Sequence, residues 1–312
     1  METRIRDNIS KKTKDFNREI DVRWPTKLQM ELTNFCNHKC EFCYIPSIER
    51  PMKSIDFDLA KHILTQAHEL GTTDIGLTAG AEPLMYKKIE EVIKFCKEDM
   101  KFDYVWITTN GINASKERWE NLLRSGLDSI KVSINGGDRE TYKRVHGADH
   151  FDRVVSTVNY LISLKEKYDF YLGISSVDMD STRESLRNIK TLFGDGPNEI
   201  YTYPVINQSG QMTTFPSYRS EYTKCNTPFD SVTITSHGYY RLCCGDMTNH
   251  TATYDLKVTS LKDAFSGKRS RDIRKRHIED NLKGTLCHRC IYNSSEEVSP
   301  LNPSLVSGKL SF

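Results

Sequence analysis

Leu32–Tyr44 reads LTNFCNHKCEFCY and places three cysteines, Cys36, Cys40 and Cys43, with three and then two residues between them. Three thiolates this close in the chain can bind three irons of a four-iron, four-sulfur (4Fe-4S) cube and leave the fourth iron without a protein ligand. A structural zinc site is the alternative, but it takes four ligands, usually as two pairs. His38 lies between the thiols, where it is poorly placed to be a fourth ligand. The spacing therefore favours an iron–sulfur cluster with one open iron, which can bind and activate a small molecule.

Composition limits where this protein works and what it binds. At 312 residues and 37% hydrophobic content the chain can bury one large and one smaller core, so two domains are expected. Nine cysteines is an odd number, and Met1–Arg23 is charged throughout without an apolar signal-peptide core. Both features favour a reducing cytoplasm with free or metal-bound thiols over a secreted disulfide framework. No apolar run reaches the roughly 18 residues that cross a bilayer. The net charge of +2 predicts neither a membrane nor a nucleic acid as partner.

Short apolar segments alternate with amphipathic helical patterns between Lys27 and about Pro204, which predicts repeated strand–helix units and a parallel sheet. Six strands favour a partial (β/α)6 barrel over a closed barrel of eight. In parallel barrels the chemistry lies at the carboxyl ends of the strands, and the cysteine segment follows the first strand. Strands are expected at 28–32, 74–78, 104–108, 129–134, 170–174 and 199–203, and helices at 57–70, 86–96, 115–125, 151–165 and 181–193.

The cysteine segment resembles the C-x3-C-x-aromatic-C motif of the radical S-adenosylmethionine (SAM) enzymes, with Phe42 as the aromatic residue. The resemblance implies that Cys36, Cys40 and Cys43 hold a 4Fe-4S cluster whose open iron binds the amino and carboxylate groups of SAM. It also implies reductive cleavage of SAM to methionine and a 5'-deoxyadenosyl radical, which abstracts hydrogen from a substrate carbon. An electron donor such as flavodoxin or ferredoxin is then a partner. The protein positions cofactor and substrate and excludes water.

Several strand-end turns are similar to the SAM contacts of that family. Gly80–Pro83, after the second strand, is similar to the family's Gly-Gly-Glu-Pro turn, which binds the SAM amino group, with Ala81 in place of the second glycine. The polar ends of the third, fourth and fifth strands are similar to the ribose, carboxylate and adenine contacts, although each alone is typical of an ordinary turn. After the fourth strand many relatives carry an arginine that pairs with the SAM carboxylate. The family's register puts His146 there, and Arg144 is the alternative donor. The implied cofactor-binding residues are Phe42, Gly80, Ala81, Glu82, Thr109, Asn110, Ser133, Arg144 and Ser175.

Four further cysteines form a second pattern in the last third of the chain. Cys225 and Cys243 lie on either side of a predicted hairpin at Gly238, and Cys287 and Cys290 are separated by two residues. The four thiols could complete a closed metal site, and the spacing alone does not separate zinc from a 4Fe-4S cube. The pattern C-x12-G-x4-C followed by C-x2-C is similar to the SPASM or shorter twitch extension of radical SAM enzymes. That similarity implies one auxiliary 4Fe-4S cluster with four protein ligands.

Two cysteines remain. Cys96 is most simply a small buried residue on the apolar face of a helix. Cys244 directly follows a predicted cluster ligand, and three interpretations stay open: a bystander, the true ligand in place of Cys243, or a thiol that donates a hydrogen atom to a substrate radical. The last would give epimerisation rather than oxidation. The basic stretch Ser260–Leu282 is expected to be a solvated helix face rather than a nucleic-acid site.

Together these patterns predict an α/β protein with a partial (β/α)6 TIM-like barrel at 28–206 and a small α+β SPASM- or twitch-like cluster domain at 207–290. An N-terminal extension at 1–27 and a tail at 291–312 complete the expected organisation, and the tail is expected to be poorly ordered unless it folds back over the active site. The extension is too short for the peptide-recognition domain of peptide-modifying relatives. We therefore expect oxidation or epimerisation of a small polar metabolite such as a sugar, aminosugar or nucleoside. The alternatives are a peptide maturase that borrows its recognition domain from another chain, and a metal-stabilised binding protein without catalysis.

Overall fold

The structure is a computed structural model that describes residues 18–217 and 225–306. Its strands form one open sheet with the order β6-β5-β4-β3-β2-β1-β7-β8-β9. The first six strands pair in parallel, as six strand–helix units require, and the sheet does not close, so the expected partial barrel is confirmed. The strands are β1 (Lys27–Met30), β2 (Asp74–Gly76), β3 (Tyr104–Thr109), β4 (Ser129–Ser133), β5 (Tyr171–Asp178), β6 (Glu199–Pro204), β7 (Val232–Ile234), β8 (Tyr239–Arg241) and β9 (Ala252–Asp255).

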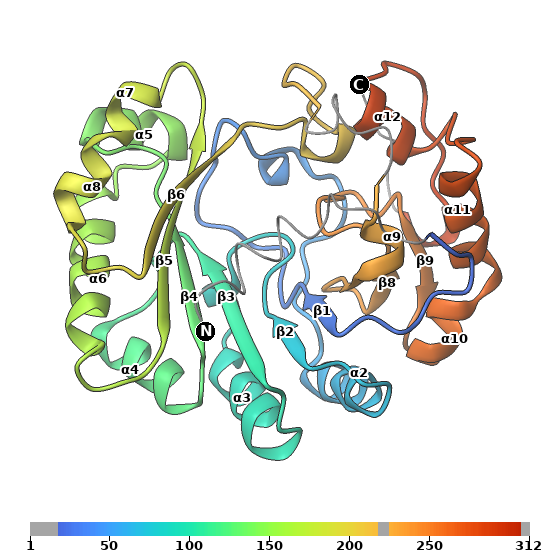
Figure 1. The fold of residues 1–312 in the computed structure, drawn as a ribbon, viewed down its shortest axis with the longest axis horizontal. Coiled ribbons are helices and arrows are strands. Elements are labelled where there is room, and N and C mark those ends of the chain that lie inside the picture. Colours follow the sequence, from blue (N-terminus) through green and yellow to red (C-terminus); the bar gives the residue numbers. More distant parts are fainter. Residues whose placement is uncertain (1–17, 218–224, 307–312) are drawn as a thin grey trace.

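The helices lie around the outside of the strands, from α8 and α6 through α3 and α2 to α10 and α11 (Figure 1). They are α2 (Phe57–Glu69), α3 (Ile89–Lys94), α4 (Lys116–Arg124), α5 (Arg139–His146), α6 (Phe151–Leu164), α7 (Arg183–Leu186), α8 (Asn188–Phe193), α9 (Thr227–Asp230), α10 (Leu261–Ser266), α11 (Lys268–Ile278) and α12 (Leu286–Tyr292). Shorter helical turns are η2 (Ile45–Ser47), η3 (Pro83–Met85), η4 (Phe95–Asp99), η5 (Gln208–Gly210) and η6 (Pro303–Leu305).

Helix α5 was not among the predicted elements. It begins after Asp138, whose side chain accepts a hydrogen bond from the Thr141 N–H, and ends at Gly147 in a left-handed conformation. Four of its eight residues are charged and the helix is short, so its apolar period is too short to detect. The buried face becomes visible only in the tertiary structure, where it carries Tyr142 and His146. The predicted helix at 181–193 forms as two short pieces, α7 and α8.

The C-terminal strands extend the barrel sheet instead of forming a sheet of their own. β7 pairs in parallel with β1, with Leu28 opposite Val232, and β8 and β9 follow in antiparallel order. Without β7, β1 would be an edge strand with a row of unpaired backbone groups. Most of the buried hydrophobic residues accordingly form one continuous core that includes Leu28, Val232 and the predicted core residue Cys96. In the part of the chain that the structure describes, no helix is long and apolar enough to cross a bilayer.

The described part of the C-terminal tail, as far as residue 306, packs against the C-terminal strands. The Leu301 N–H donates to the His250 carbonyl at 2.9 Å, and the Asn302 side chain donates to the Thr253 carbonyl at 2.9 Å. These contacts cover β9, the last strand of the sheet, whose outer edge would otherwise be open. The rest of the predicted tail, 307–312, lies outside the described residues.

Candidate cluster-binding active site

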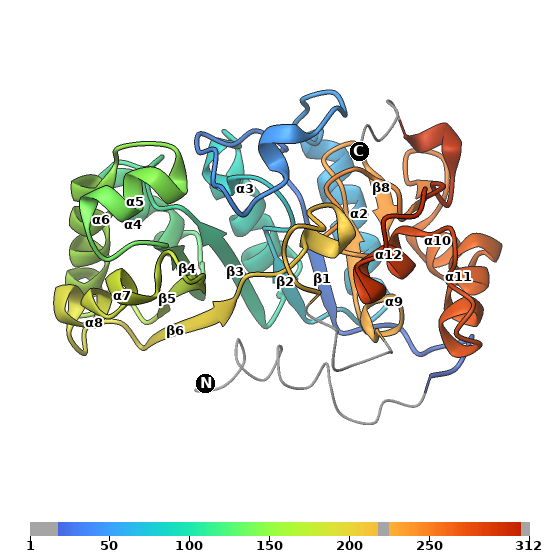
Figure 2. The same cartoon turned by 90° about the horizontal axis from the view of Figure 1, so that it is seen from above.

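The three N-terminal cysteines, called the loop thiols below, lie in the segment between β1 and α2, at the carboxyl end of β1. From above, this segment lies between the helices of the β4–β6 units and the C-terminal helices (Figure 2). Its backbone is bonded to the end of α5: the Lys39 N–H donates to the His146 carbonyl at 3.1 Å, and the Glu41 N–H to the Val145 carbonyl at 3.0 Å. The last carbonyls of a helix lack partners within the helix. The cysteine segment therefore supplies hydrogen-bond donors for the last carbonyls of α5, and the same bonds hold the segment in place.

The loop thiols are close enough to influence one another electrostatically. Burial raises the pKa of Cys36 to about 12, and burial followed by the charges of Cys43 and Cys36 raises the pKa of Cys40. Protonated thiols are poor metal ligands, and a bound cation is what draws the proton away. Three sulfur donors of one short segment, within electrostatic range of one another, fit an iron–sulfur cluster in which the fourth iron has no protein ligand.

Three of the predicted SAM contacts form one hydrogen-bonded group beside the loop thiols. The buried Glu82 carboxylate accepts from the Thr109 hydroxyl at 2.6 Å and from the Asn110 N–H at 2.8 Å. The Asn110 amide donates to Asn37, between the first two loop thiols, at 2.7 Å, and the Glu82 N–H donates to the Phe35 carbonyl at 3.1 Å. These bonds join the ends of β2 and β3 to the cysteine segment. Burial raises the pKa of Glu82.

The other predicted contacts are spread more widely. Ser133, the last residue of β4, lies opposite the buried Ser175, which is inside β5 rather than at its end, because β5 continues to Asp178. Phe42 packs in a small apolar cluster with Val145, Val177 and Met179 rather than beside the Glu82 group. Half-exposed Arg144 pairs with Glu41 at 3.1 Å and donates to the Ser181 carbonyl at 2.8 Å, whereas His146 is buried against Cys40. Arg144 and His146 therefore face different surroundings.

A buried ion pair beneath the SAM-like turn was missed in the sequence. Glu31 follows β1 and forms an ion pair with Arg50, accepting from Arg50 Nη1 at 2.8 Å and from the Ser236 N–H at 2.9 Å. Arg241 of β8 donates to the Ala79 carbonyl at 2.8 Å, directly before Gly80. The only local signal was a glutamate at the end of an apolar strand. The C-terminal strand β8 and the turn that precedes it thus contact the residues that support the SAM-like turn.

Gly80 is required by this close packing, because a Cβ at this position would collide with the Glu31 carboxylate. We expect Gly80→Ala to destabilise the protein by about 1 to 3 kcal/mol through overpacking and to weaken SAM binding. Urea unfolding and SAM titration measure the two effects. Ala81→Gly, at the neighbouring half-buried position, is the control and is expected to leave SAM binding intact. Normal SAM affinity in Gly80→Ala would show that the turn does not contribute to the SAM site.

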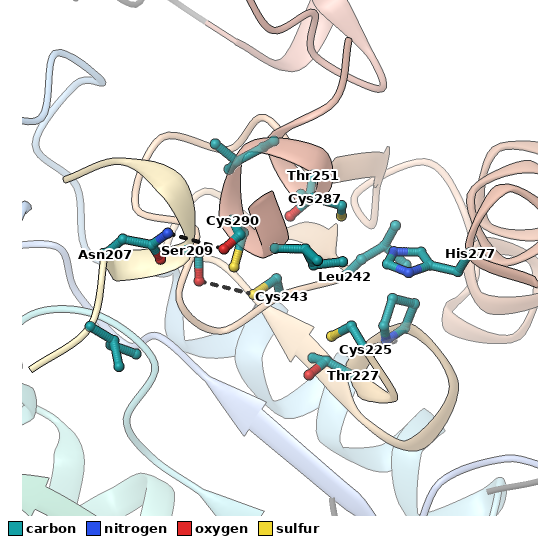
Figure 3. Close-up of a pocket in the computed structure, with 14 residues that line it drawn as sticks. Asn207, Ser209, Cys225, Thr227, Leu242, Cys243, Thr251, His277, Cys287 and Cys290 are labelled. Carbon is teal, nitrogen blue, oxygen red and sulfur yellow. Dashed lines mark hydrogen bonds between the residues drawn. The ribbon is translucent and has the colours of Figure 1, made fainter. Parts of the chain in front are cut away.

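The four C-terminal cysteines, called the cavity thiols below, come together around one cavity of about 90 Å³ (Figure 3). Cys225 precedes α9, Cys243 follows β8, and Cys287 and Cys290 lie on the same face of α12, one turn apart. Apolar residues such as Leu242 and Ile291 complete the wall. Four sulfur donors around one largely apolar cavity fit a fully protein-ligated metal site.

The structure distinguishes the two adjacent cysteines of the C-terminal part. Cys243 lines the cavity and lies 3.5 Å from the Ser209 hydroxyl, whereas Cys244 is not among the lining residues. We expect Cys243→Ser to lower the iron content from about eight to about four per chain, because a closed 4Fe-4S site loses one of its four ligands. Cys244→Ser, the matched control, is expected to keep the wild-type iron content. The reverse result, measured by anaerobic iron and sulfide analysis, would make Cys244 the ligand.

Family models match both parts of the chain. The model of the radical SAM superfamily matches residues 30–189, more than half of the chain. A model described as an iron–sulfur cluster-binding domain, SPASM, matches residues 225–291, which include all four cavity thiols. The resemblance inferred from the cysteine patterns is confirmed, and with it a SAM cofactor and 4Fe-4S clusters.

Curated relatives match about half of the chain. A protein of Saccharolobus solfataricus named "Probable GTP 3',8-cyclase" is 29% identical over 177 residues, 56% of this chain and 55% of the relative. The GTP 3',8-cyclase of Chlorobaculum tepidum is 26% identical over 151 residues, 48% of this chain and 44% of the relative. The chain thus spans about half the length of the curated relatives it matches.

Solved structures with a similar fold cover most of the chain. BtrN in complex with AdoMet and 2-DOIA superimposes with a TM-score of 0.61 at 15% identity over 90% of this chain and 97% of that chain. SuiB of Streptococcus suis, bound to precursor peptide SuiA, superimposes with a TM-score of 0.67 at 16% identity, and the match covers 82% of this chain and 68% of SuiB. Native anSMEcpe with bound AdoMet superimposes with a TM-score of 0.65 at 12% identity, and the match covers 88% of this chain and 93% of anSMEcpe. At these identities the similarity establishes the fold.

Proposed function

Because the chain belongs to the radical SAM superfamily, we propose that the loop thiols hold its SAM-binding 4Fe-4S cluster and the cavity thiols one auxiliary 4Fe-4S cluster. The observation that carries this proposal is the position of the loop thiols at the carboxyl edge of the parallel sheet, in a segment that is hydrogen-bonded to the Glu82 group through Asn37 and the Phe35 carbonyl. When bound, the cluster and SAM supply hydrogen-atom abstraction by a 5'-deoxyadenosyl radical. The chain positions the reactants: Gly80 and Ala81 belong to the amino-group turn, and β3, β4 and β5 supply polar groups for the rest of SAM.

We propose a small polar metabolite as substrate. Tyr203, near the end of β6, lies within electrostatic range of the loop thiols: burial of its hydroxyl, followed by the charges of Cys43 and Cys40, raises the pKa of that hydroxyl to about 12. The residue as a whole is 36% exposed, so Tyr203 lies at the edge of an opening with its hydroxyl on the inner side. A protonated phenol both donates and accepts hydrogen bonds, which suits substrate hydroxyl groups. The curated relatives are named for a nucleotide substrate, which supports a nucleoside or related metabolite.

The reaction proposed is oxidation or epimerisation of that metabolite. For epimerisation, Cys244 is the candidate hydrogen-atom donor, because it directly follows a cavity thiol and does not line the cavity itself. Its S–H bond would break as a C–H bond forms on the substrate, leaving a sulfur radical that needs one electron and one proton to be restored. A peptide maturase is the second candidate, since a structure with the same fold contains a precursor peptide.

The test uses anaerobically reconstituted protein with SAM and dithionite, or with flavodoxin or ferredoxin as electron donor. We expect 5'-deoxyadenosine to form, and its rate to rise when the true substrate class is added. A panel of deuterated nucleosides and sugars, compared with precursor peptides, identifies the class by deuterium transfer into 5'-deoxyadenosine. Transfer from a peptide would replace the small-molecule proposal with the maturase. Protein that holds iron but never cleaves SAM would favour a non-catalytic binding protein.

A further inference from the structure

A chain of three histidines leads from a loop thiol to the protein surface. His146 Nδ1 lies 3.6 Å from Cys40 Sγ and 3.1 Å from His38 Nδ1. His38 Nε2 lies 3.1 Å from His150 Nδ1. His146 and His38 are buried, and His150 is partly exposed. The three rings therefore form one hydrogen-bonded path whose inner end is a proposed cluster ligand.

The proton positions follow from a single backbone contact. His146 Nε2 lies 3.1 Å from the Asn135 nitrogen, which can only donate, so Nε2 accepts and carries no proton. A neutral imidazole then has its proton on Nδ1, the nitrogen that faces both Cys40 Sγ and His38 Nδ1. His38 can accept at Nδ1 and pass its own Nε2 proton toward His150. The contact with Asn135 thus orients the N–H of His146 toward the sulfur.

The ring of His146 is held in this orientation on several sides. Tyr142, one turn earlier on α5, stacks on it with ring centroids 4.0 Å apart and an interplanar angle of 21°. The backbone carbonyl of His146 also accepts the bond from Lys39 in the cysteine segment. The side chain and the loop thiols therefore belong to one rigid unit. His146 is 1% exposed, so water does not compete for its N–H.

We propose that His146 is a positioning residue whose Nδ1–H donates a hydrogen bond to the Cys40 thiolate and thereby raises the reduction potential of the SAM-binding cluster. The inference rests on the proposed function, because it takes Cys40 as a cluster ligand. A thiolate carries negative charge, so the bond to it is charge-assisted and prevails over the neutral acceptor on His38. Hydrogen bonds to cluster sulfurs favour the reduced, more negative state. His146 then acts on the cluster rather than on the SAM carboxylate, the role that the resemblance implied for its position.

Two substitutions separate this role from a purely structural one. The amide of His146→Asn reaches the place of Nδ1 and can still donate to the sulfur. The amide of His146→Gln reaches only the place of Nε2 and the Asn135 N–H. We expect His146→Asn to keep a potential near that of the wild type, and His146→Gln and His146→Leu to shift it to lower values. His150→Asn, at the exposed end, is the control and is expected to leave the potential unchanged.

The measurements are an anaerobic redox titration followed by electron paramagnetic resonance (EPR) and proton electron–nuclear double resonance in H2O and D2O, on holoprotein. The SAM-sensitive signal identifies the catalytic cluster, and the auxiliary cluster is an internal reference whose potential should not move. We expect a strongly coupled exchangeable proton in the wild type and in His146→Asn that is absent from the other two His146 variants. If His146→Leu fails to assemble the cluster, the comparison of His146→Asn with His146→Gln still tests whether the hydrogen bond to Cys40 sets the potential.

An unchanged potential and an unchanged proton coupling in His146→Gln would overturn the inference. If the wild-type protein still cleaves SAM when His146→Gln has no effect, the proposed function remains supported. A wild-type protein without a SAM-sensitive signal would instead overturn the proposed function, and the inference with it. The two failures are therefore distinguishable in the same samples.

Discussion

Replacing Cys36, Cys40 and Cys43 together by alanine is expected to abolish SAM cleavage and to reduce the iron content from about eight to about four per chain. The physical reason is that the three thiols are the sulfur donors of the cysteine segment, and with them removed nothing of matching chemistry replaces them. The cavity thiols come from α12 and the regions next to α9 and β8, so their site should persist. Anaerobic iron and sulfide analysis, EPR with and without SAM, and 5'-deoxyadenosine formation measure the effect.

Cys96→Ala is the matched control for the loss of a thiol. Cys96 is fully buried in the hydrophobic core, so its removal costs packing energy but should leave the iron content and the SAM-sensitive signal unchanged. A triple variant with eight irons would contradict the assignment of the loop thiols. About four irons with zinc in the wild type would keep the SAM cluster and make the cavity site a structural zinc site.

The barrel could be predicted from the sequence because its signals are local. Each of the first six strands is a short apolar run bounded by turn residues, and each appears within a few residues of its expected range. The pairing of β7 with β1 could not be predicted, because it joins Leu28 to a residue about two hundred positions later. No periodic pattern in either strand specifies that partner. Helix α5 could not be predicted for a related reason, because its buried face is defined by the residues from other segments that pack against it.

The candidate site also contains residues that the sequence predicts from local patterns and residues that only the fold reveals. The loop thiols form a compact motif, and the cavity thiols a looser one, so both sets could be named from spacing. The choice between Cys243 and Cys244 depends on side-chain direction, which needs the fold. The contact of His146 with Cys40 joins positions 106 residues apart. Residues whose role lies in one long-range contact leave no trace in a single sequence.

The buried Glu31–Arg50 ion pair is the long-range contact whose loss we expect to reduce the stability of the protein most. We expect Glu31→Gln to lower the free energy of unfolding by about 3 to 5 kcal/mol, because Arg50 would stay buried without its counter-charge. The Arg50 side chain is only 2% exposed, so water cannot take the place of the carboxylate. Glu41→Gln is the matched control: it removes an ion pair with half-exposed Arg144, worth about 1 kcal/mol or less. Urea unfolding followed by circular dichroism measures both variants.

The same pair predicts how stability depends on pH. Burial alone would raise the pKa of Glu31, but the charge and hydrogen bonds of Arg50 and the charge of Arg241 hold it below its ordinary value of 4.5. A carboxyl whose pKa is lowered by folding stabilises the protein fully above its unfolded pKa, and this contribution is lost as the pH falls through the folded value. The difference in stability between wild type and Glu31→Gln should therefore be constant near neutral pH and shrink below about pH 4.5. A difference that does not change with acidification would mean that packing around Glu31, rather than its charge, stabilises the turn that carries Gly80.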